Sequence, residues 1–189
     1  LALGAAGALA VPLDYLATPG EVETVLRGYG CRRAFVAGSR VAMLREIQGG
    51  ADLQIHALED GADQEDSPSW RALLSDLAEP LPPLVGEAPM MLVHTSGTTG
   101  APKSFTLNGA NIWANVRALV DERLAGPGDR LLLPLPLHHI YPFVVGLLAP
   151  LASGVAVVFP EGLAGPQIVQ ALRLGAATGE LVQGETAPG

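Results

Sequence analysis

Short apolar segments alternate with helix-length segments along most of this sequence, and the alternation limits the folds that the chain can adopt. The expected strands cover residues 33–37, 53–58, 90–94, 104–107, 131–133 and 155–159. The expected helices cover residues 18–29, 41–48, 67–79, 108–124, 144–151 and 166–174. Strands that alternate with helices predict an α/β fold with a mostly parallel sheet flanked by helices. Because the strands are short and apolar, they fit a sheet that is buried on both faces.

Two of the expected helices begin with specific capping signals. Thr18 stands at a capping position, Pro19 suits the first helical turn, and Glu21 completes a capping box. Asn108 is expected to cap the longest helix. One face of that helix carries an apolar stripe that consists of Ile112, Val116, Leu119 and Val120. The final stretch, 175–189, shows no clear period and is expected to be a loop or a frayed end.

The charge balance limits the classes of partner. With 11 basic and 19 acidic residues among 189, the net charge is −8, which argues against nucleic acid because phosphate backbones need clustered Lys and Arg. Five carboxylates fall within residues 59–66, which we interpret as a solvated loop. A calcium site is the weaker alternative, since no EF-hand pattern is present, and no metal ligand is predicted. Cys31 is the only cysteine, so we expect a buried structural thiol and a reducing, cytoplasmic location.

Two apolar stretches resemble membrane signals only superficially. Residues 1–13 lack an initiating Met and a preceding basic region, so they make a poor signal peptide. Because the chain opens inside an apolar element, it is expected to be an internal piece of a larger protein. Residues 131–159 contain four prolines and two histidines, and they are expected to form strand, loop, helix and strand instead of a transmembrane span. Peripheral membrane contact and the oligomeric state are left open.

Residues 94–104 read His-Thr-Ser-Gly-Thr-Thr-Gly-Ala-Pro-Lys-Ser and carry the clearest chemical signal. Gly97 and Gly100 let the backbone approach an anion closely, and Lys103 adds a positive charge. Hydroxyl donors for phosphate oxygens come from Thr95, Ser96, Thr98 and Thr99. The segment is not a Walker A motif, because two residues separate Gly100 from Lys103. A hairpin turn rich in Gly and Thr is the alternative, and the lysine at its offset favours a polyphosphate site.

The segment 95–103 resembles the phosphate-binding signature of the adenylate-forming (AMP-binding) superfamily. This superfamily includes acyl-CoA synthetases, adenylation domains of peptide synthetases and firefly luciferase. Val11-Pro12-Leu13-Asp14 upstream and Leu135-Pro136-Leu137-His138-His139-Ile140-Tyr141 downstream resemble two further family segments, in the family order and at about the family spacing. The resemblance implies that residues 1–189 form a single α/β fragment of the large N-terminal domain, with the C-terminal domain absent.

The same resemblance implies the roles of individual residues. ATP would be bound through its β- and γ-phosphates by Thr95, Ser96, Gly97, Thr98, Thr99, Gly100 and Lys103. Lys103 and His139 are the expected catalytic residues, and His139 would lie beside the carboxylate substrate. His138 and His94 stand where the family usually has an aromatic residue, and both are expected to be structural. The ligands of Mg²⁺ are expected outside these residues.

Two positions depart from the family pattern, since Ser104 and Pro142 replace glycines. The downstream motifs for adenine, ribose and magnesium are not found after Phe159, so the 189 residues alone are expected to lack appreciable synthetase activity. The resemblance implies that the complete protein activates a carboxylic acid, expected to be a fatty acid, with ATP and transfers it to CoA. Two alternatives stay open: an adenylation domain that loads a carrier protein, and a degenerate, non-catalytic nucleotide-binding module.

Overall fold

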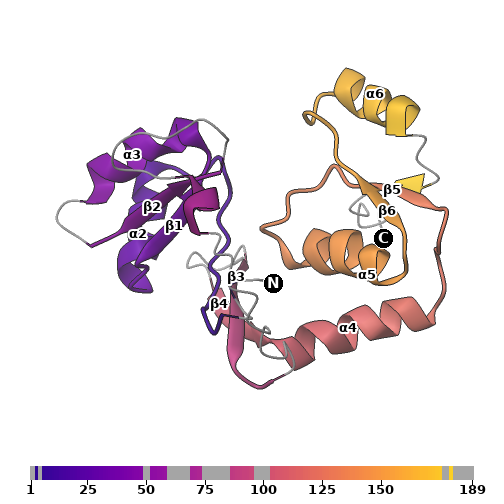
Figure 1. Ribbon diagram of the computed structural model, residues 1–189, viewed down its shortest axis with the longest axis horizontal. Helices are drawn as coiled ribbons and strands as arrows, with labels where there is room; N and C mark the ends of the chain where they lie inside the picture. Colours follow the sequence, from indigo (N-terminus) through magenta and orange to yellow (C-terminus); the bar gives the residue numbers. More distant parts are fainter. Residues whose placement is uncertain are drawn as a thin grey trace, which may run out of the picture. The chain divides into compact units, whose positions relative to one another are not determined.

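A computed structural model of the chain describes residues 3, 6–48, 52–58, 69–73, 86–95, 103–175 and 179–180 (Figure 1). The chain divides into two compact units. One unit is Leu13–Pro80, and the other combines Leu1–Pro12 with Leu81–Gly189. The organisation of residues 1–189 as one fragment of a larger domain stays a prediction.

The unit Leu13–Pro80 is built around a parallel strand pair joined by a helix. Its elements in chain order are α2 (Pro19–Gly28), β1 (Arg33–Val36), α3 (Gly38–Gln48), β2 (Gln54–Ala57) and the 3₁₀ helix η1 (Trp70–Leu73). The register of β1 and β2 pairs Arg33 with Gln54 and Val36 with Ala57. A parallel pair needs a crossover connection, and α3 supplies it. The predicted strand–helix alternation is therefore confirmed in this unit.

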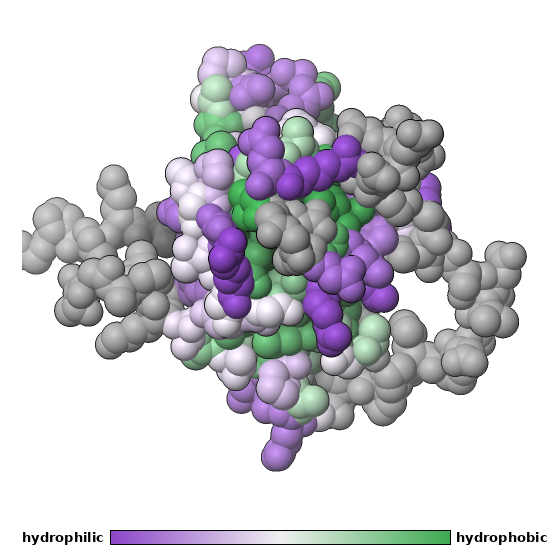
Figure 2. Space-filling view, turned by 90° about the vertical axis from the view of Figure 1, so that its left-hand side faces the viewer, coloured by the Kyte–Doolittle hydropathy of each residue, from purple (hydrophilic) through white to green (hydrophobic). Residues whose placement is uncertain are grey.

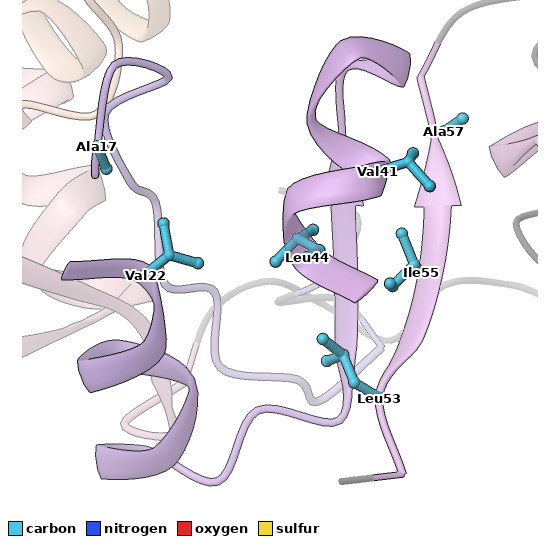
Figure 3. Packing of buried hydrophobic residues seen from close by; sticks show 7 residues of the cluster. All are labelled: Ala17, Val22, Val41, Leu44, Leu53, Ile55 and Ala57. Atoms are coloured by element: carbon cyan, nitrogen blue, oxygen red, sulfur yellow. The ribbon is translucent and has the colours of Figure 1, made fainter. Parts of the chain in front are cut away.

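The core of this unit lies between α3 and the two strands (Figure 3). Figure 3 shows Val41 of α3 on the side that faces β2, and Val22 of α2 pointing toward Leu44 of α3. Val41 and Leu44 are each only 2% exposed. The rest of the cluster consists of Ala17, Leu53, Ile55 and Ala57. Burying each such aliphatic side chain contributes about 1.5–3 kcal/mol relative to exposure, so this cluster holds the helices on the strands.

The start of α2 agrees with its sequence signals, and the start of α3 does not. The Thr18 backbone N–H donates to Glu21 Oε2 at 2.7 Å, and the Glu21 N–H donates to Thr18 Oγ1 at 3.4 Å, which completes the predicted capping box. Helix α3 begins at Gly38, ahead of the predicted start at residue 41. The first turn of α3 is polar, so no hydrophobic periodicity marks it in the sequence. Its backbone is nevertheless hydrogen-bonded, since the Arg40 N–H donates to Ala37 O at 2.8 Å.

The other unit contains an antiparallel strand pair formed by β3 (Pro89–Thr95) and β4 (Lys103–Asn108). This pair is the antiparallel exception in a fold predicted to be mostly parallel. The connection between the strands is too short for a parallel crossover, which needs a dozen or more residues. The preceding segment also joins β3, since Ala10 forms a parallel bridge with Met91.

Helix α4 (Gly109–Asp121) follows β4 directly and is capped as predicted. The Asn111 N–H donates to Asn108 Oδ1 at 2.8 Å, and the Asn108 N–H donates to Asn111 Oδ1 at 3.3 Å. The helix ends at Asp121, short of the predicted end at residue 124. Arg123 has a φ of 52°, and this left-handed conformation stops a right-handed helix.

The remaining strands form a three-stranded parallel sheet in the order β6–β5–β7. Their bounds are Arg130–Leu132 for β5, Ala156–Val158 for β6 and Gly179–Glu180 for β7. A π-helix, η2 (Pro142–Leu148), and α5 (Ala149–Ala152) connect β5 to β6, and α6 (Gly165–Gly175) connects β6 to β7. Figure 1 shows α5 and α6 on opposite sides of β5 and β6, as the α/β prediction requires.

Two predictions in this region were wrong in detail. The helix expected at residues 144–151 begins at Pro142 and is π-helical through Leu148, where the Ala149 N–H bonds to Val144 O. Its buried side chains pack against Ile112 and Val116 of α4, so tertiary packing favours the wider turn. The stretch expected to be a loop from residue 175 contains β7, which pairs with β5. A strand of two residues is too short to show a period in the sequence.

Several large apolar side chains stay exposed, and Figure 2 shows hydrophobic residues gathered near the middle of one face. Apolar atoms make up a large share of every folded protein's surface, so this area assigns no partner by itself. Among the described residues, no helix combines the length and the apolar character needed to cross a membrane.

Candidate functional site

The strands β3 and β4 bring the two ends of the predicted phosphate segment together. Thr95 is the last residue of β3, Lys103 is the first residue of β4, and the two are Cα partners in the antiparallel register. Such partners lie about 4.5–5.5 Å apart between Cα atoms. Ser96, Gly97, Thr98, Thr99 and Gly100 lie outside the described residues. The structure therefore describes how the segment is anchored, and the roles of its residues stay predictions.

The anchor is a buried strand with a partner on each edge. Met91, Leu92 and Val93 of β3 are 9%, 5% and 3% exposed. On the edge away from β4, the Ala10 N–H donates to Met90 O at 2.9 Å and the Leu92 N–H donates to Ala10 O at 2.8 Å. Ala10, which directly precedes the upstream segment 11–14, is therefore a neighbour of β3.

The residue pair beside this anchor includes one of the departures from the family pattern. His94 of β3 is partly buried and is the Cα partner of Ser104 in β4. Ser104, which replaces a family glycine, is exposed. Serine adopts extended strand geometry without strain, so this replacement is compatible with the strand pair as it stands.

The downstream segment places two imidazole rings beside each other after β5. The ring centroids of His138 and His139 are 4.0 Å apart, with an angle of 46° between the ring planes. His138 is half-buried and His139 is exposed. The His139 N–H donates to Pro136 O at 3.4 Å, and its carbonyl accepts from the Phe143 N–H at 3.2 Å. The backbone of His139 is therefore held on both sides.

This position in the sheet is one at which α/β proteins bind ligands. β6 and β7 lie on opposite sides of β5, so the strand order reverses at β5, on the side of β7. In open α/β sheets, ligands bind outside the carboxyl ends of the strands at the point where the order reverses. His138 and His139 follow the carboxyl end of β5. The sequence segment alone did not indicate this placement.

The second departure from the family pattern, Pro142, begins the π-helix η2. Pro142 is buried, and η2 follows His139 within three residues. Proline suits the first helical turn because its missing N–H needs no partner there. π-helical turns are rare and occur frequently at functional sites. The helix packs through Val144 and Leu148 against α4, which anchors the segment that carries the two histidines.

Other groups with reactive potential do not add to this site. Burial raises the pKa of the Cys31 thiol, which makes its thiolate scarcer and agrees with the structural role expected for it. In the described part of the chain, no group of three or more His, Cys, Asp or Glu side chains is arranged to hold a metal ion. The acidic stretch 59–66 lies outside the described residues.

A cavity of about 170 Å³ lies between the end of β6 and α6. Its lining includes Val158, Phe159, Glu161, Gln167, Gln170 and Leu174. Among the described residues, those predicted for the site do not line it. Sequence reasoning assigned nothing to these positions, since their spacing matches no motif.

The comparisons with known proteins agree with the sequence segments and with the fold. Residues 1–177 match the family described as AMP-binding enzyme. A sulfoacetate–CoA ligase from Cupriavidus necator is 37% identical over 156 residues, which are 82% of this chain and 30% of that protein. The mitochondrial malonate–CoA ligase ACSF3 from Homo sapiens is 43% identical over 72 residues, which are 38% of this chain and 12% of that protein.

The inhibitor-bound N-terminal domain of FACL13 from Mycobacterium tuberculosis has the same fold, with a TM-score of 0.75 at 20% identity. The match covers 94% of this chain and 44% of that one. The chain spans less than a third of either curated relative, 30% and 12% of their lengths. Because the family match covers residues 1–177 of 189, this chain belongs to the family of AMP-binding enzymes, and its α/β fold is that of their N-terminal domains.

Proposed function

We propose that the full-length protein that carries this sequence is an acid–thiol ligase. It activates a carboxylic acid with ATP to an acyl-adenylate. The CoA thiol then loses its proton and attacks the acyl carbonyl, the acyl–phosphate bond breaks, and AMP leaves as the thioester forms. The observation that carries the proposal is the pairing of Thr95 with Lys103 at the ends of β3 and β4. This pairing supports a phosphate-binding segment held at both ends by an antiparallel strand pair in which β3 is buried, in a chain that belongs to the AMP-binding family.

Each predicted site residue has a role in this reaction. A carboxylate oxygen attacks the α-phosphorus, the bond from that phosphorus to the bridging oxygen breaks, and pyrophosphate leaves. Lys103 and the hydroxyls of residues 95–99 bind the departing phosphates, because the charge that develops on them needs donors and a cation. His139 is the candidate contact for the acid, since an imidazole donates well to a carboxylate. Mg²⁺ would accompany ATP, with its protein ligands expected outside these residues, so no step is derived through the ion.

The identity of the acid has two candidates. The segment 135–142 resembles fatty acyl ligases, which supports a fatty acid. The relatives support a short acid with a second anionic group, because sulfoacetate and malonate are both of that kind. Since the sulfoacetate ligase aligns with 82% of this chain, we rank the short dianionic acid first.

The acceptor and the location are also proposals. CoA is the proposed acceptor, because both relatives are named as CoA ligases. The alternatives are transfer to a carrier protein and a non-catalytic nucleotide-binding module. We propose a cytoplasmic location, in line with the single cysteine among these 189 residues. The 189 residues alone are expected to yield no acyl-CoA, and a measurable yield would contradict that expectation.

The decisive experiment is acid-dependent ATP–pyrophosphate exchange on the full-length protein. Sulfoacetate, malonate, acetate, octanoate, palmitate and amino acids are compared, beside a Lys103→Ala variant. The matched control is Arg117→Ala, which removes an exposed charge from α4. Exchange with an acid that is lost in Lys103→Ala and kept in Arg117→Ala supports the ligase and identifies its acid. If none of the acids supports exchange, the ligase proposal is contradicted and the non-catalytic module is favoured.

A further inference from the structure

The side chain of His139 has an unusual combination of a fixed backbone and an exposed ring. Its N–H and carbonyl are both hydrogen-bonded, to Pro136 and Phe143. Within the described residues, the ring of His139 has one ring contact, which is the contact with His138. An exposed side chain with a fixed backbone still samples several rotamers. A single orientation of the ring therefore requires a contact with a neighbouring side chain.

His138 has the geometry to supply that restriction. Its ring is half-buried and lies 4.0 Å from the ring of His139, tilted by 46°. Tilted and offset arrangements are the favoured ones for planar rings, with centroids usually about 4.5–7 Å apart, so these two rings lie unusually close to each other. His138 stands where the family resemblance expects an aromatic residue, so a ring at this position is retained although its chemistry has changed.

We propose that His138 is a positioning residue that acts through His139. Its ring contact holds the imidazole of His139 in one orientation at the carboxyl end of β5. The inference rests on the proposed function, in which His139 contacts the acid. If the imidazole of His139 is already oriented before the substrate binds, less conformational entropy is lost when the substrate binds and reacts.

The expected size of the effect follows from the strength of such ring contacts. Loss of a ring pair corresponds to about a 3- to 10-fold change in an equilibrium or a rate. We therefore expect His138→Ala to raise the KM for the acid in the exchange reaction by about 3- to 10-fold, with a smaller change in kcat.

Two further substitutions separate the ring from its hydrogen-bonding capacity. His138→Phe keeps a ring and removes the nitrogens, whereas His138→Gln keeps a polar amide and removes the ring. In the full-length protein, positioning by the ring predicts that Phe restores the KM and that Gln leaves it raised. It also predicts that the double variant His138→Ala/His139→Ala behaves like His139→Ala alone, because His138 acts through His139. Trp113→Ala on α4 is the matched control for removal of an exposed ring, and it is expected to leave the KM unchanged.

The outcomes distinguish this proposal from the proposed function. Rescue by Gln instead of Phe, or additive losses in the double variant, would show that His138 contacts substrate directly and would overturn the positioning role. An unchanged KM in His138→Ala would overturn it as well. NMR spectra of the histidine ring protons test the contact independently of activity, since removal of the His138 ring shifts the His139 signals. If the NMR spectra show the ring contact but no acid supports exchange, the proposed function is wrong, and the positioning role that depends on it is wrong as well. If the His139 signals are unchanged in His138→Ala, only the positioning role is wrong.

Discussion

The ring of Phe35 in β1 stacks on the ring of His56 in β2, with 5.2 Å between the centroids and 24° between the planes. His56 is only 5% exposed, and neither of its ring nitrogens has a hydrogen-bond partner among the residues that the structure describes. An unpaired buried polar group costs about 1–3 kcal/mol of stability. The buried imidazole of His56 therefore lowers the stability of the unit Leu13–Pro80.

Replacing His56 by leucine is expected to stabilise the protein. His56→Leu keeps a similar volume and removes both unpaired nitrogens, so the free energy of unfolding should rise by about 1 kcal/mol. Urea unfolding followed by circular dichroism measures the change. The control is His139→Leu at an exposed position, where the change should stay within about 0.5 kcal/mol. A loss of stability in His56→Leu would show that the imidazole makes a favourable contact.

Removing the cap of α2 is expected to destabilise the same unit. Thr18→Ala deletes the hydroxyl that accepts the Glu21 N–H, and N-cap deletions cost about 1 kcal/mol. Thr18→Ser keeps the hydroxyl and should restore most of the stability. Thermal unfolding of the two variants tests this, and equal melting temperatures for Thr18→Ala and the parent would contradict the cap.

The same cap is expected to depend on pH. The backbone and hydroxyl of Thr18 both donate to Glu21, and these bonds lower the pKa of its carboxyl from the ordinary value of 4.5. A lowered pKa in the folded state means that the stabilisation is present above pH 4.5 and is lost as the pH falls through the lowered value. The stability difference between the parent and Glu21→Gln should therefore shrink below pH 4.5. A difference that stays constant down to the acid transition would refute this linkage.

Replacing Gly175, at the end of α6, by any larger residue is expected to destabilise the protein. A Cβ atom there would lie 2.7 Å from Val158 Cγ1, and the stiff valine side chain has little freedom to move away. Gly175→Ala should destabilise the protein by about 1–3 kcal/mol. Gly165→Ala in the same helix meets open space and should be neutral or slightly stabilising. Denaturant midpoints of both variants test the contrast, and an equal effect at the two positions would contradict it.

Lys103 is the only lysine among these 189 residues, so amine labelling of a peptide from this stretch reports on Lys103 alone. If Lys103 binds the phosphates of ATP, ATP should protect it from modification, with AMP protecting less because AMP lacks the β- and γ-phosphates. Mass spectrometry of the labelled peptide measures the protection in the full-length protein, and the N-terminal amine provides the internal control. Equal labelling with and without ATP would argue against a phosphate role for Lys103.

Local features of the fold could be predicted because their causes lie within a few residues. The capping pairs Thr18–Glu21 and Asn108–Asn111 each span three positions, and the structure contains both. The apolar stripe with Ile112 and Val116 faces the core, since a helix repeats its face every three to four residues. The phosphate segment was likewise recognisable from its residues alone, and the family match agrees with it.

The features that were missed depend on contacts between distant residues. The π-helical turn at Pro142–Leu148 arises where that segment packs on α4, and no local pattern distinguishes it from an ordinary helix. Strand β7 has only two residues and exists because β5 offers it an edge. The antiparallel direction of β4 follows from the short connection between two strands whose pairing the residue types leave undefined.

The sequence by itself determined the family, the strand–helix alternation and the helix caps, because these depend on residue type and short spacing. On the same basis it predicted the residues that would carry the chemistry. The tertiary structure alone decided which segments are neighbours. It joined Ala10 to β3, set Thr95 opposite Lys103, and put His138 and His139 after the carboxyl end of β5, where the strand order reverses. The physical reason is that strand order and ring contacts depend on the free energy of the whole packed chain. A short stretch of sequence does not specify that free energy.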